Sequence, residues 1–216
     1  MSRDYGQYCG LARALDVVGD RWNLLIVREL LIGPARYGEL RDGLSGIATN
    51  LLTDRLRDLE AAGVVERRLS EDANAVSYAL TSWGAQLREP VNALIRWSMP
   101  LMIRGPEGDE FRPDGLLVAL PALFAGRMPT DQSRAVGITV DGGMVQLCAT
   151  KSGIDVDRPD GRKLDAVLTA EAQLVFGLAV GVLSLDDVAT LVDIDGDQSA
   201  LRTFFEAPKS AIDFTK

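Results

Sequence analysis

The chain has 216 residues, 47% hydrophobic and 25% charged, which fits one large globular domain or two smaller ones. It contains no histidine, and its two cysteines, Cys9 and Cys148, lie far apart, so the commonest general base and the usual metal-ligand spacings are missing. No segment is long and apolar enough to span a bilayer, and the N-terminus has no apolar stretch typical of a secretion signal. We therefore expect a cytoplasmic protein with free thiols, no metal and no cofactor. We also expect no enzyme activity, since no P-loop, dinucleotide-binding glycine motif or nucleophile elbow is present.

The net charge of −8 is unevenly distributed along the chain. Residues 1–104 hold 13 arginines, no lysine and 13 acidic residues, whereas residues 105–216 hold 10 basic and 18 acidic residues. Such a change favours two units with different roles: an N-terminal domain over 1–104, a breaker-rich linker over 105–113 and a second domain over 114–216. The acidic second domain is a poor phosphate binder, and the neutral first domain would need a local set of arginines to bind DNA.

The first domain shows four short helical patterns and then a change of period. Apolar spacing predicts helices over residues 9–18, 22–31 and 37–44, and a fourth between Gly46 and Gly63. In the fourth, Leu52, Leu56 and Leu59 share one face, which taken alone is more typical of a plain packing helix. Strands over 64–69 and 76–80, joined by a polar turn at 70–75, predict a β-hairpin, or wing.

Two helices joined by a tight glycine-containing turn, followed by a hairpin, favour a winged helix-turn-helix, whose second helix enters the major groove. The polar face of the fourth helix offers amide, hydroxyl, carboxylate and guanidinium groups able to contact base edges. The candidate base-contacting residues are Asn50, Thr53, Asp54 and Arg57, with Thr49 at the start of the helix. The candidate phosphate-contacting residues are Arg36, Arg55, Arg67 and Arg68.

A last helix is expected over 83–104, kinked or broken at Pro90 and with Pro100 near its end. This helix and the first one carry more apolar surface than a three-helix core needs. The excess favours a homodimer, which would place two recognition helices about 34 Å apart on one face of an inverted-repeat DNA site. The alternative is that this helix covers the second domain.

The residues of this half resemble the HxlR-type winged-helix transcriptional regulators, which are related to the MarR group. The resemblance is carried over residues 9–30, 36–40, 51–65 and 78–84. It implies a homodimer that binds DNA sequence-specifically, and we expect a repressor. Where the family commonly has a Ser-Pro pair this chain has Ala48-Thr49, so we expect Thr49 to cap the helix; the wing tip, 71–74, is acidic and lacks proline. Cys9 matches a cysteine that some members use as a redox sensor, although a half-buried small residue at a dimer seam is the more ordinary interpretation.

The second half has a different pattern. A short apolar helix over 114–126 is expected to break or bend near Pro121. Strands over 135–140 and 144–149 flank Asp141-Gly142-Gly143, a strong hairpin signal. Further strands are expected over 153–156, 166–169 and 191–194, and helices over 170–181, 184–190 and 197–205.

This order, with residues 168–172, 181–187 and 192–201, resembles the sterol-carrier-protein type 2-like domain. The resemblance implies a C-terminal α/β domain with a curved sheet and an apolar cavity for a hydrophobic small molecule, and the whole chain is then of the α+β class. A solid core without a cavity is an equally plausible interpretation of the apolar helix 170–181. The candidate ligand-binding residues are Leu120, Phe124, Val145, Leu174 and Leu178.

The favoured hypothesis is a DNA-binding transcriptional regulator whose C-terminal domain senses a hydrophobic small molecule. One alternative is a lipid carrier or scaffold that uses the winged helix for protein contacts, which the neutral charge of residues 1–104 supports. Another is a regulator switched by oxidation of Cys9.

Overall fold

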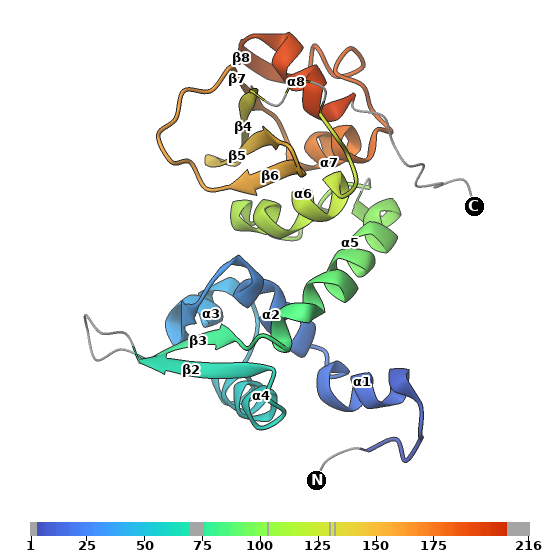
Figure 1. The fold of residues 1–216 in the computed structure, drawn as a ribbon, viewed down its shortest axis with the longest axis vertical. Helices are drawn as coiled ribbons and strands as arrows, with labels where there is room; N and C mark the ends of the chain where they lie inside the picture. Colours follow the sequence, from blue (N-terminus) through green and yellow to red (C-terminus); the bar gives the residue numbers. More distant parts are fainter. Residues whose placement is uncertain (1–3, 70–75, 103, 130, 132, 207–216) are drawn as a thin grey trace. The chain divides into compact units, whose positions relative to one another are not determined.

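The computed structural model describes residues 4–69, 76–102, 104–129, 131 and 133–206, and these residues form two compact units, 1–91 and 92–216 (Figure 1). The division falls inside one helix, whereas the change of charge and the breaker-rich segment suggested a linker at 105–113. Each unit has its own core and is described by itself. No helix of the described residues is long and apolar enough to cross a membrane.

The first unit begins with four helices: α1 (Gly10–Val18), α2 (Asn23–Ile32), α3 (Tyr37–Gly43) and α4 (Thr49–Ala61). All four expected helices are therefore confirmed, with no end more than three residues from its expected place. Buried leucines and isoleucines of α2, α3 and α4 form the core, among them Ile26, Leu40, Leu52 and Leu56. Asn23, itself buried, joins the first two helices because its Nδ2 donates to the carbonyl of Val17 at 2.8 Å.

Helix α4 ends in a glycine turn that leads into the wing. Gly63 has φ +76°, a left-handed conformation that favours glycine. The amide of Val64 donates to Leu59 O at 2.9 Å and that of Gly63 to Glu60 O at 3.0 Å, which is the Schellman pattern. These bonds satisfy the last carbonyls of the helix and turn the chain directly into the next strand.

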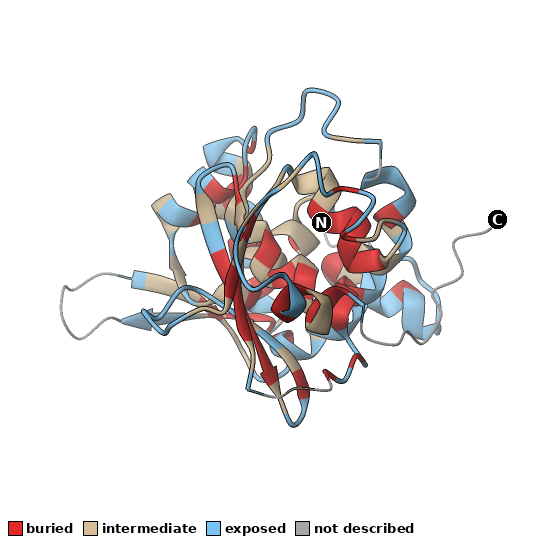
Figure 2. Ribbon diagram, turned by 90° about the horizontal axis from the view of Figure 1, so that it is seen from above, coloured by how far each residue is buried: buried red, intermediate tan, exposed pale blue. Residues whose placement is uncertain are grey.

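The wing is the antiparallel pair β2 (Val65–Leu69) and β3 (Val76–Leu80), as expected. A two-residue strand, β1 (Ala35–Arg36), adds to the other side of β3 and was not foreseen, so the sheet order is β1-β3-β2. In Figure 2 the hairpin is largely exposed toward its outer end, and its side chains at Leu69 and Val76 are exposed. The expected acidic wing tip, 70–75, lies outside the described residues.

The expected helix over 83–104 is two elements, a 3₁₀ turn η1 (Gly84–Leu87) and helix α5 (Arg88–Met102). Pro90 lies in the first turn of α5, where proline is tolerated because the amide it lacks has no partner in the helix. The kink or break expected at Pro90 is thus wrong, since the change of helix type comes before it. Arg88 fixes the start of α5, its Nη2 donating to Leu31 O at the end of α2 at 3.2 Å.

The second unit is built on a five-stranded mixed sheet of order β6-β5-β4-β7-β8. Its strands are β4 (Ala135–Val140), β5 (Gly143–Thr150), β6 (Gly153–Asp157), β7 (Ala166–Thr169) and β8 (Asp193–Gly196). All pairs are antiparallel except β4 with β7, which are parallel in the register Val136 to Ala166. The expected hairpin is confirmed, with Asp141 and Gly142 both at positive φ (48° and 78°), as a type I′ turn requires.

Besides the part of α5 after residue 91, this unit contains η2 (Pro113–Gly115), α6 (Leu116–Phe124), α7 (Ala172–Val180) and α8 (Gln198–Phe205). Alternate residues of β4 and β5, such as Val136, Ile138 and Leu147, are fully buried and form one apolar cluster with side chains of these helices. In Figure 2 the buried residues accordingly gather on the helices and the central strands. The α+β class and the mixed sheet agree with expectation.

Helix α6 contains Pro121, where the sequence suggested a break or a bend, and the helix is not broken there. One expected element of the second unit is wrong. The helix expected over 184–190 is a series of turns, in which Leu191 N donates to Val188 O at 2.8 Å and Ala189 N to Asp186 O at 3.5 Å. Such i→i+3 bonds close single turns, and the chain then enters β8 instead of extending a helix.

A buried arginine joins the ends of two of these helices. Arg127 is 5% exposed, and its Nη1 donates to Phe204 O and Phe205 O at 3.3 Å each, while its Nη2 donates to Ala179 O. These carbonyls lie at the C-terminal ends of α7 and α8, where the helix dipole favours a cation. Burial lowers the pKa of Arg127 below its ordinary value.

Candidate nucleic-acid interface

Helix α4 has one buried and one exposed face, as its sequence indicates. Leu52, Leu56 and Leu59 are at most 1% exposed and pack into the core of the first unit. Asn50, Asp54 and Arg57 are exposed. The helix therefore presents an amide, a carboxylate and a guanidinium on its solvent face while the leucines hold it in place.

The start of α4 differs from expectation in its cap. Ala48 is the N-cap residue and no side chain caps the helix, so the expectation that Thr49 caps it is wrong. Thr49 occupies the first helical position and is exposed. Within the first turn, the amide of Leu51 donates to Asn50 Oδ1 at 2.9 Å. The helix N-terminus carries the partial positive charge that favours an anion such as a phosphate.

Tyr37 anchors this end of the helix and was not singled out from the sequence. Its hydroxyl donates to Thr49 O at 2.7 Å and lies 3.3 Å from Thr53 Oγ1. Thr53 Oγ1 also donates to Thr49 O at 3.0 Å. The hydroxyl of Thr53 is thus engaged within the protein, and Tyr37 at the start of α3 ties the two helices of the helix-turn-helix together. Only the position of Tyr37, at the first residue of α3, signals this role in the sequence.

The arginines of the candidate interface differ in their partners. Arg57 is exposed and, among the described residues, forms no ion pair. Arg36 is exposed as well, and its backbone amide donates to Glu39 Oε2 at 2.6 Å. Of the predicted set, these two guanidinium groups face solvent and pair with no carboxylate of the described residues.

Arg55 is turned toward other elements of the protein. Its Nη1 pairs with Asp20, in the turn after α1, and with Asp58 at 3.2 Å. The side chain is 20% exposed, and its Nε is buried without a hydrogen-bond partner. The guanidinium therefore links α4 to the turn after α1, and a contact with phosphate would compete with two carboxylates.

Both arginines of the wing are also paired. Arg67 Nη2 lies 3.1 Å from Glu60 Oε2, and its guanidinium lies 5.7 Å from the centre of the Tyr78 ring. Arg68 Nη2 lies 2.7 Å from Glu66 Oε1. Arg67 and Arg68 are exposed, so a nearby phosphate can compete for both of them.

The candidate redox residue lies at the N-terminus of α1. Cys9 is an exposed free thiol and the N-cap residue of that helix. Hydrogen bonds from the amides of Ala12 and Leu11 hold the pKa of Cys9 below its ordinary value, because they stabilise the thiolate. Burial raises the pKa of the other cysteine, Cys148, which is buried.

The five candidate ligand-binding residues meet in one place. Four of them are 2% exposed or less, and the fifth, Leu174, is partly buried and packs against the same apolar cluster. The cluster contains Leu120, Phe124, Val145 and Leu178. The structure therefore brings the five together between α6, α7 and the sheet.

Comparison with known proteins places the first half of the chain in a family. The HxlR-like helix-turn-helix family matches residues 17–104. An HTH-type transcriptional regulator of Synechocystis, sll1512, is 36% identical over 90 residues, which make up 41% of this chain and 67% of that protein. The regulator Rv3095 of Mycobacterium tuberculosis is 38% identical over 108 residues, 49% of this chain and 61% of that protein.

The solved structure of a putative transcriptional regulator of the MarR family from Enterococcus faecalis is 34% identical, covering 44% of this chain and 86% of that one with a TM-score of 0.39. This chain spans about two thirds of the length of the cyanobacterial relative and about three fifths of the mycobacterial one. From its N-terminal helices and wing, the chain belongs to the HxlR-like helix-turn-helix family.

Proposed function

We propose that the protein is a DNA-binding transcriptional regulator that reads its site with helix α4. The observation that carries this proposal is the exposed, polar face of α4, on which the guanidinium of Arg57 forms no ion pair with any described residue. Membership of a family whose relatives are HTH-type transcriptional regulators supports it. In this proposal Thr49, Asn50, Thr53, Asp54 and Arg57 contact bases, and Arg36, Arg55, Arg67 and Arg68 contact phosphates.

Replacing Arg57 by Ala tests the assignment. Genomic fragments retained by the purified protein are titrated against wild type, Arg57→Ala and, as a control in the other unit, Arg158→Ala. Arg57→Ala should weaken binding by roughly 1–3 kcal/mol and relax the preference at one base pair. Unchanged affinity and preference would rule out Arg57 as a base contact. Binding that does not weaken with salt would instead favour the scaffold alternative.

We further propose that the regulator is a homodimer. On α1, Leu11 is 68% and Leu15 39% exposed, and on α5, Leu94, Trp97 and Leu101 are 47%, 76% and 57% exposed at a spacing of three and four residues. Apolar stripes of this kind on a helix are typical of a protein–protein seam. A twofold dimer would cover the apolar stripes of both protomers at once. It would also place one recognition helix on each half of an inverted-repeat DNA site.

Sedimentation of Trp97→Asp tests the dimer. It should shift the protein toward monomer, whereas Leu191→Asp, the same kind of change at a 64% exposed residue outside α5, should not. Equal effects of the two changes, or none, would contradict a seam on α5.

The sign of regulation that we propose is repression, and a promoter–reporter assay with and without the gene checks it.

For residues 114–216 we propose a sterol-carrier-like domain that binds a hydrophobic small molecule. Support comes from the buried apolar cluster that contains Leu120, Phe124, Val145 and Leu178 and against which Leu174 packs. Mass spectrometry of organic extracts from the purified full-length protein should reveal a bound apolar molecule. No extracted molecule, together with no thermal stabilisation by a long-chain fatty acid, would contradict this role.

The exposed Cys9 thiol, with its lowered pKa, supports a second candidate function, in which oxidation of this residue controls DNA binding. Cys9→Ser should then bind DNA as wild type does but lose any response to peroxide or diamide. A full response in Cys9→Ser would exclude the mechanism.

A further inference from the structure

The carboxylates of α4 differ in whether they have a partner. Asp58 Oδ2 lies 3.2 Å from Arg55 Nη1, and Glu60 Oε2 lies 3.1 Å from Arg67 Nη2. The side chain of Asp54 is exposed and forms no ion pair or hydrogen bond with any residue that the structure describes. Asp54 is therefore the carboxylate of α4 that remains available to a group outside the protein.

Asp54 does not pair with the cation of its own face either. Arg57 lies three residues further along the helix, a spacing at which side chains of opposite charge commonly pair. No ion pair joins the two, and Arg57 forms none elsewhere in the described part of the chain. The exposed face of α4 thus carries a free anion beside a free cation.

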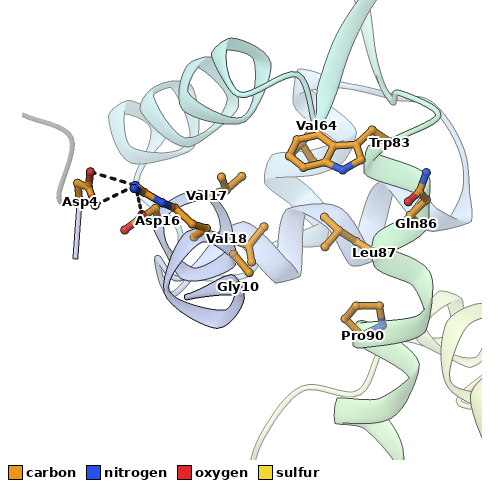
Figure 3. A pocket seen from close by; sticks show the side chains of 12 residues that line it. Asp4, Gly10, Asp16, Val17, Val18, Val64, Trp83, Gln86, Leu87 and Pro90 are labelled. Carbon is orange, nitrogen blue, oxygen red and sulfur yellow. Dashed lines mark hydrogen bonds and ion pairs between the residues drawn. The ribbon is translucent and has the colours of Figure 1, made fainter. Parts of the chain in front are cut away.

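No role within the first unit accounts for this carboxylate. Asp54 is the sixth residue of α4, beyond the first turn in which an acid stabilises the helix dipole. It does not line the groove between α1 and the η1–α5 corner, whose side chains Figure 3 shows and which the two helices of the proposed dimer seam border. Replacing Asp54 should therefore leave both the fold and the dimer intact.

Asn50, Asp54 and Arg57 form one stripe along α4. Residues four and three apart lie on the same side of a helix, here displaced by about 6 Å and about 4.5 Å along its axis. Asn50 Oδ1 accepts from the Leu51 amide at 2.9 Å, which leaves Nδ2 of the same amide group to donate outward. The stripe therefore presents a donor, an acceptor and a donor in that order.

We propose that Asp54 is the specificity-determining residue of α4 and that it selects a cytosine in the major groove. This inference rests on the DNA-binding function proposed above. An ionised carboxylate can only accept, so it fits the N4 amino group of cytosine and is repelled by O6 and N7 of guanine and by O4 of thymine. Adenine fits less well, because its N7 acceptor lies beside its amino group. The donors Asn50 and Arg57 favour acceptors such as guanine on either side.

The same carboxylate acts against all other sequences. Phosphates repel it, so Asp54 lowers the affinity for any duplex and is compensated only where an amino group meets it. Specificity is a difference between affinities, and a repulsive group raises that difference by weakening the wrong complexes. Removing the charge should therefore increase the affinity for unrelated DNA and decrease the preference for the proper site.

Selection from a pool of random duplexes tests the assignment. Wild type should enrich a site with a cytosine fixed at one position. Fluorescence anisotropy then measures the affinities of wild type and Asp54→Asn for that site, for the site with its C·G pair changed, and for a scrambled duplex. Asp54→Asn should bind the scrambled duplex more tightly than wild type does. Its preference for the cytosine should fall roughly five- to a hundredfold.

Asp58→Asn is the matched control, because it removes the same charge from the same helix while Arg55 keeps Asp20 as a partner. It should retain the full preference for the cytosine. An enriched site without a fixed cytosine, an unchanged preference in Asp54→Asn, or equal losses in the two variants would overturn this inference and leave the DNA-binding function standing. Failure of wild type to enrich any sequence would overturn both.

Discussion

The pairing of Arg67 with Glu60 makes a specific prediction about DNA affinity. The guanidinium at the base of the wing lies 3.1 Å from the Glu60 carboxylate at the end of α4 and over the Tyr78 ring. A phosphate that contacts Arg67 must therefore displace a carboxylate first. Glu60→Gln removes that competition and keeps the size of the side chain and its capacity for hydrogen bonding.

The magnitude follows from the exposure of the pair. The side chains of Arg67 and Glu60 are 48% and 35% exposed, and ion pairs this exposed are worth at most about 1 kcal/mol. The affinity for duplex DNA should thus rise by up to about fivefold per protomer. Each phosphate neutralised releases condensed counterions, so the slope of log K against log salt should steepen by about 0.9 for each Arg67 set free.

Fluorescence anisotropy with a mixed-sequence duplex at several salt concentrations measures both quantities, because a phosphate contact does not depend on sequence. Asp114→Asn is the control, since it raises the net charge equally by breaking the pair with Arg158 in the other unit. A steeper slope for Glu60→Gln alone supports the reasoning. The same change in both variants would show that net charge, not a freed Arg67, is responsible, and would refute it.

Three further results are expected from the packing and the thiols. Leu56→Ala, at a 1% exposed position on α4, should lower the free energy of unfolding by about 2–5 kcal/mol in urea titrations. A loss below about 1 kcal/mol would contradict a tightly packed core at this position. Gly84→Ala should lower the melting temperature because its Cβ meets Val64 O at 2.0 Å, whereas Gly38→Ala, with nothing within 4 Å, should not; equal effects would deny the close approach. Cys9 has a lowered and Cys148 a raised pKa, so iodoacetamide at neutral pH should label Cys9 first and Cys148 only after unfolding, which peptide mass spectrometry checks. Labelling in the reverse order would contradict both environments.

The local features of the fold could be predicted because each depends on neighbours in sequence. The leucines at 52, 56 and 59 mark the buried face of α4 by their spacing, and Asp141-Gly142 marks a hairpin by its need for positive φ. The turns over 184–190 resemble a helix in sequence because Ser184 and Asp187 cap one another there as they would at a helix start. The helix does not continue because the chain then forms β8, which pairs with β7, and this pairing cannot be read from the local sequence.

The partners of the arginines could not be predicted in the same way. Asp20 and Arg55 are 35 residues apart in sequence, and nothing local indicates that they pair. Arg13 differs, because its partner Asp16 lies at i+3 on the same helix, a spacing that the sequence does indicate, whereas its other partner, Asp4, lies nine residues away. Side-chain composition predicts which groups an interface contains, but their competition for one another appears only once the chain is folded.

If the proposed DNA contacts are correct, this competition should make a domain with equal numbers of acidic and basic residues selective for the sequence of its DNA site. If every arginine were free, the first unit would bind any duplex through its phosphates. Here Arg55, Arg67 and Arg68 are each held by a carboxylate, while Arg57 on the exposed face of α4 has no such partner in the described part of the chain. Non-specific affinity should therefore be lower, because each proposed phosphate contact must first break an ion pair. Contacts of Arg57 with a fitting base edge carry no such cost, so the free energy of binding should depend more on sequence than the arginine content suggests.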